Sequence, residues 1–223
     1  TSQVLKIFIN TVQFWYRQKA RSKGVTNSRC GAVTVIQRSG GALNLNVHFH
    51  TLFLDGVYCK NAGKYRFQAV KGPTADELEG LVLKIRKKTI LLLEKQGYLE
   101  MERERNPTIH QELAQASILQ TAASGERMGQ AIRRLKNDLD DQNIKLSSDG
   151  VNLGGFSLHA KVNIAAAQRK KLEKLCRYIG RGPLAMERMI EVPGGEIAYR
   201  PKRPWNDGTT HIIFTPRELI EKL

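Results

Sequence analysis

Cysteine is scarce in this sequence, which holds three among 223 residues. Cys30, Cys59 and Cys176 lie far apart and match none of the spacings of zinc sites or redox pairs. A disulfide framework and a cysteine-based metal centre are therefore excluded. We expect three ordinary reduced thiols.

Long apolar runs are also missing. No window approaches the roughly 18 consecutive apolar residues of a membrane-spanning helix, and no charged-then-apolar leader opens the chain. We therefore expect no membrane partner and a cytoplasmic location. The chain begins with Thr and helical periodicity starts at once, so we also expect it to be part of a longer protein. A hydrophobic content of 41% suffices for one good-sized core, or one core with a helical appendage.

Acidic residues are absent from the first 54 positions, which contain seven Lys or Arg residues. A second basic stretch, from Arg169 to Arg203, holds ten basic residues against four Glu. The acids gather instead at 76–104 and 138–141. Over the whole chain, 36 Lys plus Arg against 21 Asp plus Glu give a net charge of +15. Such segregated charge indicates a protein that binds a polyanion, with solvated helix faces as the alternative.

Apolar periodicity and turn residues predict the element order βββ, αα, β, α, βββ behind a first helix. The expected helices cover the start of the chain to about 23, then 75 to about 96, about 109–138 and 165–179. The expected strands cover 30–37, 42–54, about 65–70, 156–164, about 189–192, 197–199 and a last segment near 211. Thr74 and Glu77 form a predicted capping box, and a polar linker is expected at 143–155. The order predicts an α+β fold with a central antiparallel β-sheet and helices packed on it, as one domain over 1–223 with a helical insertion at about 75–140.

Two histidines alternate within the strand-like run "NVHFHTLFLDG", residues 46–56. Residues i and i+2 of a strand share a face, so His48 and His50 converge while Phe49 packs on the other side. Two neutral imidazoles can grip one divalent cation. If the preceding turn centres on 40–43, Gln37 lies across from this part of the strand and its amide oxygen can complete a three-ligand site. The alternative is a pair of polar residues on a half-solvated face.

A tyrosine near the end of a basic helix supplies a second element, in "LEKLCRYIGRGPLA". Tyr178 is flanked by Arg177 and Arg181. A phenol that faces a metal site can attack a phosphate and form a phosphotyrosine link while the cation polarises the phosphate. The alternative is a tyrosine that only packs.

Four sequence blocks in order carry a resemblance over essentially the whole chain: "QRSGGALNLNVHFHTLFLDGVY", "GFSLHA", "LCRYIGRGPLA" and "KRPWNDGTTH". They resemble the bacterial rolling-circle insertion-sequence transposases of the HUH (His-hydrophobic-His) endonuclease superfamily, the two-tyrosine transposase family. The resemblance implies a palm-like fold, His48 and His50 as Mg²⁺ or Mn²⁺ ligands with Gln37 as third ligand, and Tyr178 as nucleophile. It also implies single-stranded DNA partners, namely mobile-element ends and target DNA, and a bacterial, nucleoid-associated protein.

The chain departs from the two-tyrosine pattern at Lys174, which stands four residues before Tyr178 where those members carry a second tyrosine. It therefore resembles a single-tyrosine branch, for which a homodimer or a step resolved by water is expected. The amino-terminal cysteine-rich segment usual in the family is also missing.

The remaining candidates are expected to contact DNA. Arg177 and Arg181, at i, i+4 spacing, are expected to flank the attacked phosphate together with Lys174. His159 is a second candidate for the third metal ligand, or else holds a phosphate. Lys202 and Arg203 precede Trp205, a cation and aromatic combination that suits an unstacked base, although a core tryptophan with solvated basic neighbours explains it equally.

These features predict a metal-dependent, tyrosine-using endonuclease and strand transferase. Two alternatives stay open at this point. One is a replication initiator or relaxase, which nicks and religates at an origin, and the other is a catalytically silent DNA-binding module.

Overall fold

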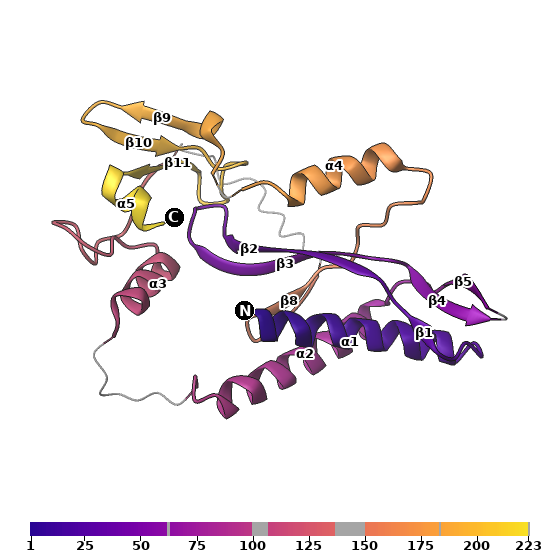
Figure 1. Cartoon of the computed structure of the whole chain (residues 1–223). Coiled ribbons are helices and arrows are strands. Elements are labelled where there is room, and N and C mark those ends of the chain that lie inside the picture. The colour runs from indigo at the N-terminus through magenta and orange to yellow at the C-terminus, as the bar shows by residue number, and fades with distance from the viewer. Residues whose placement is uncertain (62, 100–106, 137–149, 183, 223) are drawn as a thin grey trace. The chain divides into compact units, whose positions relative to one another are not determined.

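The computed structural model describes residues 1–61, 63–99, 107–136, 150–182 and 184–222 (Figure 1). Helices and antiparallel strands follow one another along the chain, which confirms the expected α+β class. The helices are α1 (Ser2–Arg21), α2 (Ala75–Lys95), α3 (Ile109–Leu119), α4 (Arg169–Ile179) and α5 (Pro216–Glu221), with one 3-10 turn, η1 (Met186–Arg188). The strands are β1 (Ser28–Arg29), β2 (Ala32–Ser39), β3 (Leu45–Phe53), β4 (Gly56–Asn61), β5 (Lys64–Ala69), β6 (Arg133–Lys136), β7 (Val151–Leu153), β8 (Phe156–Leu158), β9 (Met189–Val192), β10 (Glu196–Tyr199) and β11 (Thr209–Phe214).

The described strands are distributed over four antiparallel sheets. A three-stranded sheet has the order β1-β4-β5 and a four-stranded sheet has the order β6-β11-β10-β9. The hairpins β2-β3 and β7-β8 make two further sheets of two strands each. The expected palm-like arrangement around a single central sheet stays a prediction.

Contacts within the chain define two compact units. Unit 1 consists of Thr1–Val35, Phe49–Arg103 and Ser147–Ile179, and unit 2 consists of Ile36–His48, Glu104–Leu146 and Gly180–Leu223. This division does not test the expectation of one domain with a helical insertion, which stays a prediction.

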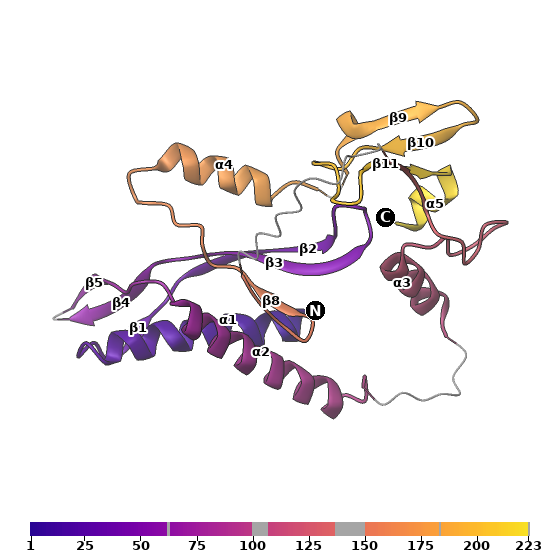
Figure 2. The ribbon, with the colours of Figure 1, turned by 180° about the vertical axis from the view of Figure 1, so that it is seen from behind.

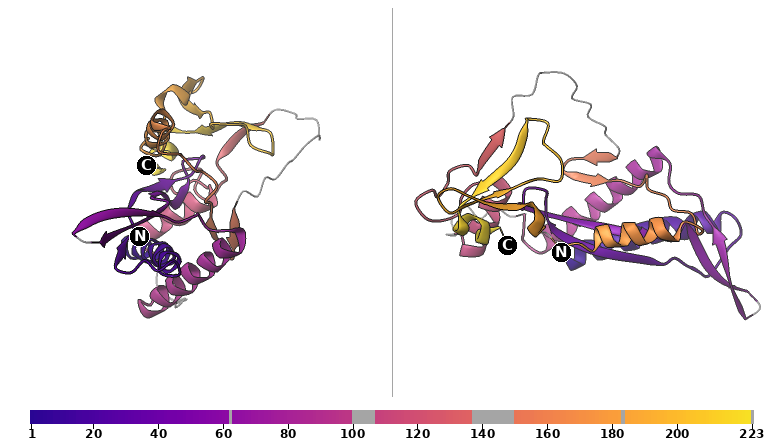
Figure 3. Two further views of the ribbon diagram at one scale, coloured as in Figure 1. Left: turned by 90° about the vertical axis from the view of Figure 1, so that its right-hand side faces the viewer. Right: turned by 90° about the horizontal axis from the view of Figure 1, so that it is seen from above.

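Unit 1 is built on helix α1, whose apolar residues recur with helical spacing and face the three-stranded sheet. Val12, Tyr16 and Ala20 are buried against Val57 of β4 and Val70. A second helix, α2, lies beside α1 (Figures 1 and 2), and the Lys88 ammonium donates to the Thr11 hydroxyl at 3.3 Å. The short β7-β8 hairpin lies beside α2 (Figure 3).

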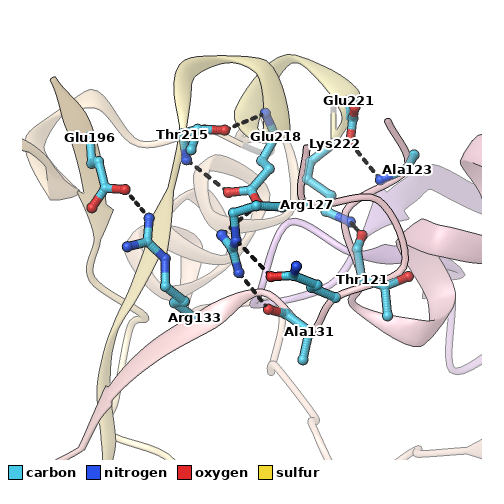
Figure 4. Close-up of polar contacts among 11 residues, drawn as sticks. Thr121, Ala123, Arg127, Ala131, Arg133, Glu196, Thr215, Glu218, Glu221 and Lys222 are labelled. Carbon is cyan, nitrogen blue, oxygen red and sulfur yellow. Dashed lines mark hydrogen bonds and ion pairs between the residues drawn. The ribbon is translucent and has the colours of Figure 1, made fainter. Parts of the chain in front are cut away.

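Unit 2 has its own core between the four-stranded sheet, the β2-β3 turn and α5. Phe214, Ile212 and Leu43 are almost fully buried in it. A polar network closes the same unit (Figure 4). Glu218, 2% exposed, accepts a hydrogen bond from Arg127 Nη1 at 2.7 Å and one from the backbone N–H of Thr215 at 2.8 Å.

Several expected elements are confirmed. The capping box of Thr74 and Glu77 starts α2, and Gly97, with φ of +70°, follows its end. Helix α1 stops before Gly24, which takes φ of +80°. The turn between β2 and β3 is closed by Gly40, whose N–H donates to the carbonyl of Asn44 at 2.8 Å, and β3 begins only at Leu45 because the residues before it fold into the unit 2 core.

Other expectations are wrong. The helix expected over 109–138 ends at Leu119, and residues 133–136 form strand β6 because they pair with β11; residues 137–138 lie outside the described residues. The described end of the expected linker, 150–155, contains β7. The strand expected over 156–164 ends at Leu158, because its partner β7 offers no residue to pair with beyond Val151. Helix α4 begins at Arg169, four residues later than expected. Strand β4 and helix α5 were not expected.

None of the helices in the described part of the chain combines the length and apolarity needed to cross a bilayer.

Candidate active site

Strand β3 carries both histidines with an aromatic residue between them. Phe49 stacks on Phe8 of α1, with ring centroids 6.0 Å apart and an interplanar angle of 21°. Phe53, four residues further along β3, also contacts Phe8 edge to face, with ring centroids 6.0 Å apart. Because alternate strand residues face opposite ways, His48 and His50 lie on the face of β3 opposite to Phe49. This is the division of the strand expected from the sequence.

The hydrogen bond of His48 decides which of its ring nitrogens carries the proton. Nδ1 lies 2.8 Å from the backbone carbonyl oxygen of Asn46. A carbonyl can only accept, so Nδ1–H is the donor, and in the neutral ring Nε2 then carries the lone pair. A backbone acceptor behind one ring nitrogen is the usual support of a histidine that binds a metal through the other.

Tyr178 lies beside the second histidine. The ring centroids of His50 and Tyr178 are 6.3 Å apart and the planes meet at 75°, an edge-to-face pair within unit 1. The tyrosine comes from the last turn of α4, where Ile179 is buried, and its own side chain is 46% exposed. The phenol is therefore held next to one histidine of the pair while part of it faces solvent.

Asp55, at the end of the β3 segment, joins two other parts of unit 1. The Tyr16 hydroxyl of α1 donates to Oδ1 at 3.3 Å, and Asn163 Nδ2 donates to Oδ2 at 3.2 Å. Burial first, and then Asp55, raises the pKa of Tyr16 above its usual range. Asn163 belongs to the connection that leads into α4. Sequence reasoning missed this anchor, because nothing in the local pattern links residues 16, 55 and 163.

The basic residues expected around the phosphate differ in their placement. Lys174 and Arg177 are exposed on α4, and Arg177 Nη2 donates to Glu173 Oε1 at 2.7 Å, one turn earlier. Arg181 is exposed but lies beyond the end of α4 at Ile179. The i, i+4 spacing of Arg177 and Arg181 therefore does not fall within one helix, and contact of either residue with DNA stays a prediction.

Gln37 and His159 are the two candidates for a third metal ligand. Gln37 is half-buried on β2. The ring of His159 is exposed and packs on Gly150, where an added Cβ would lie only 2.2 Å from Nδ1. No three His, Cys, Asp or Glu side chains in the described ranges gather closely enough to hold a metal ion. The assignment of either residue as a third ligand stays a prediction.

Trp205 has a different cationic neighbour from the one expected. Arg134 of β6 places its guanidinium carbon 4.7 Å from the indole centroid, and the ring packs on the unit 2 core. Lys202 and Arg203 are exposed. The Arg134 contact arises from the pairing of β6 with β11, and the expected pattern could not reveal it.

Asp207 completes this corner of unit 2. It lies 3.6 Å from Arg134 and 3.3 Å from Lys136, and Oδ1 accepts a hydrogen bond from the Thr209 N–H at 3.1 Å. The hydrogen bonds of Thr209, followed by the charge of Lys136, lower the pKa of Asp207 to about 2.

An α+β chain with a segregated positive charge and a tyrosine beside a histidine of strand β3 has the features of a DNA-processing protein. The family model described as "Putative transposase" matches residues 31–223. The chain therefore belongs to this transposase family. No curated protein and no solved structure matches it.

Proposed function

We propose that this transposase is a metal-dependent HUH endonuclease that nicks and joins single-stranded DNA at the ends of a mobile element, by rolling-circle transposition. The observation that carries the proposal is the contact of Tyr178 with His50, at 6.3 Å between ring centroids. A tyrosine that only packs has no need of a histidine pair, whereas a phenol that attacks a phosphate has to lie beside the group that neutralises the phosphate charge.

We propose Mg²⁺ or Mn²⁺ as the bound ion. His48 and His50 would hold the ion with ring nitrogens, and Nε2 of His48 is the nitrogen that the Asn46 carbonyl leaves as acceptor. The hydroxyls of Thr34 and Thr51 lie 2.9 Å apart across the β2-β3 hairpin. A ladder that continues in this register brings Gln37 opposite His48, which supports the amide oxygen as third ligand.

The chemistry assigned to Tyr178 is a single displacement at phosphorus. Its Oη attacks a backbone phosphate, a bond forms between phosphorus and Oη, and the bond to the 3′ oxygen breaks. The 3′ oxygen leaves with the bonding electron pair and takes up a proton, and the phenol proton passes to solvent. The products are a 5′-phosphotyrosine link and a free 3′-hydroxyl. A bound divalent cation would polarise the phosphate and stabilise the leaving oxygen.

One nucleophile per chain limits what a single copy can do. Helix α4 offers Lys174 where a second tyrosine would stand one turn earlier. Two covalent links at the same time therefore need two chains, and we propose a homodimer or a final step resolved by water.

The test is formation of a covalent adduct on labelled single-stranded oligonucleotides that carry the element ends, with Mn²⁺ or Mg²⁺, on a denaturing gel. Tyr178→Phe should abolish the adduct and leave DNA binding intact. Tyr98→Phe is the matched control, because Tyr98 is an exposed tyrosine of the same unit and should keep the adduct. Binding to the cognate end without any adduct would leave a silent DNA-binding module in place of an enzyme.

A further inference from the structure

The three-stranded sheet of unit 1 has one face that no core residue occupies. In its ladder Tyr58 is opposite Phe67, and Lys60 is opposite Tyr65. On the other side of β4, Arg29 of β1 is opposite Tyr58. Residues directly opposite one another in an antiparallel ladder project from the same face, and so do residues i and i+2 of one strand. These five side chains therefore share one face.

The opposite face of the same sheet is the buried one. Val57, adjacent to Tyr58, is fully buried in the core that α1 forms with the sheet. The three rings on the outer face remain exposed, with Tyr58 at 44%, Phe67 at 47% and Tyr65 at 69%. Large aromatic side chains gathered on an open sheet face indicate an interaction surface.

The rings are arranged as a platform. Tyr58 and Phe67 contact each other with centroids 5.2 Å apart, and Lys60 Nζ lies 6.0 Å from the centroid of Tyr65. Gly56 makes room for this layer, because a Cβ at that position would lie 2.6 Å from the ring of Phe67. The glycine lets the Phe67 ring lie across strand β4.

The platform face carries two cations, Arg29 and Lys60, beside the rings. Lys64 and Arg66 alternate onto the other face of β5, and residues 56–71 contain no Asp or Glu. Flat rings interleaved with cations fit a ligand with flat rings and anionic links between them. Single-stranded nucleic acid has this chemistry, since each base offers a face for stacking and each link a phosphate.

We propose that Tyr58, Tyr65 and Phe67 form a base-stacking platform for single-stranded DNA, with Arg29 and Lys60 as its phosphate contacts. The choice of DNA rests on the proposed function, and the stacking surface itself does not depend on nicking. The platform would bind the strand outside the nicked phosphate and without sequence preference, because every base has a stacking face.

The experiment compares the affinity of the full chain for a fluorescent oligo(dT) 20-mer with its affinity for an abasic 20-mer of equal charge. EDTA is present so that no strand is cut, and anisotropy is read at constant salt. Stacking of one base on one ring corresponds to roughly a 5- to 150-fold change in affinity. We expect the wild type to bind oligo(dT) at least about fivefold more tightly than the abasic strand. Tyr65→Ala and Phe67→Ala should each reduce this preference about fivefold or more. Tyr65→Trp should keep the preference, because indole also stacks.

Controls separate the platform from general damage. Tyr98→Ala removes an exposed ring elsewhere in unit 1 and should leave the preference unchanged. Circular dichroism melts identify variants that fail to fold, and Tyr65→Ala is the safest of them because its ring is the most exposed of the three. Lys60→Ala should weaken both oligonucleotides equally and lower the salt dependence by about 0.7 in log–log slope.

The outcomes keep the two proposals apart. Equal binding of both oligonucleotides by wild type, or an unchanged preference in both Tyr65→Ala and Phe67→Ala, overturns the platform even if the tyrosine adduct forms. Loss of the preference in those variants supports the platform even if no adduct is ever observed.

Discussion

Asp55 allows the most direct test of how unit 1 holds its parts together. Asp55→Ala removes the acceptor of the Tyr16 hydroxyl and of the Asn163 amide. Tyr16 is only 4% exposed, so most of its side chain stays buried and its hydroxyl loses its acceptor when the carboxylate is removed. A buried donor left without its acceptor costs about 1–3 kcal/mol, and the exposed contact of Asn163 adds only ~0.5 kcal/mol. We expect the free energy of unfolding to fall by about 1–3 kcal/mol.

The measurement is urea unfolding followed by tryptophan fluorescence. Trp15 lies 4.9 Å from the ring of Tyr16 and reports on this region. With a slope of about 2 kcal/mol per molar urea, the midpoint should fall by roughly 0.5–1.5 M at unchanged slope. Tyr16 has a raised pKa in the folded state, so its contribution to the free energy of unfolding is fully present below about pH 10. The contribution is lost as pH rises above about 10 toward the pKa of the folded state.

A second substitution isolates the cause. Tyr16→Phe in the Asp55→Ala background removes the stranded hydroxyl, so the double variant should regain most of the lost stability. A loss below about 0.5 kcal/mol for Asp55→Ala, or no recovery in the double variant, would refute the reasoning. The single variant Asn163→Ala should change stability little but lower adduct formation about tenfold at unchanged DNA affinity, since it loosens the connection into α4.

Three further predictions concern other residues. Glu218→Ala should lower the free energy of unfolding by about 2–4 kcal/mol in chemical denaturation, because it leaves Arg127 without its carboxylate and removes a capping box. Glu187 is an exposed acid of the same unit, and Glu187→Ala should lower the free energy of unfolding by less than ~0.5 kcal/mol. Asp207 has a pKa lowered to about 2, so its stabilisation is present above about pH 4 and is lost as pH falls toward 2. The decrease in the free energy of unfolding between about pH 4 and pH 2 should be smaller in Asp207→Asn than in the wild type. An equal decrease in both proteins would show that Asp207 is not its source. His48→Ala should weaken Mn²⁺ binding at least tenfold by calorimetry, and equal affinity would place the ion elsewhere.

Local signals in the sequence were sufficient for several elements. Thr74 and Glu77 mark the start of α2 with side chains that pair with backbone groups only three residues away. Gly24 marks the end of α1 in the same local way, because the chain needs a left-handed residue there. Alternation alone predicted that Phe49 and the two histidines lie on opposite sides of their strand.

Long-range pairing explains the expectations that failed. The run at 133–136 has good helix formers, yet it is a strand because β11, more than 70 residues later, offers it a ladder. Strand β7 is only three residues long and exists through its pairing with β8. Neither partner can be identified from the residues of the segment itself.

Residue types, and spacing within single elements, were enough to predict the α+β class, the positive charge, the histidine pair and the tyrosine that follows it. Tertiary packing was needed to bring Tyr178 to His50, Asp55 to Tyr16 and Asn163, and Arg134 to Trp205. These contacts join residues up to 128 positions apart, as in the pair of His50 and Tyr178. Packing of separate elements creates such contacts, and no local periodicity encodes them.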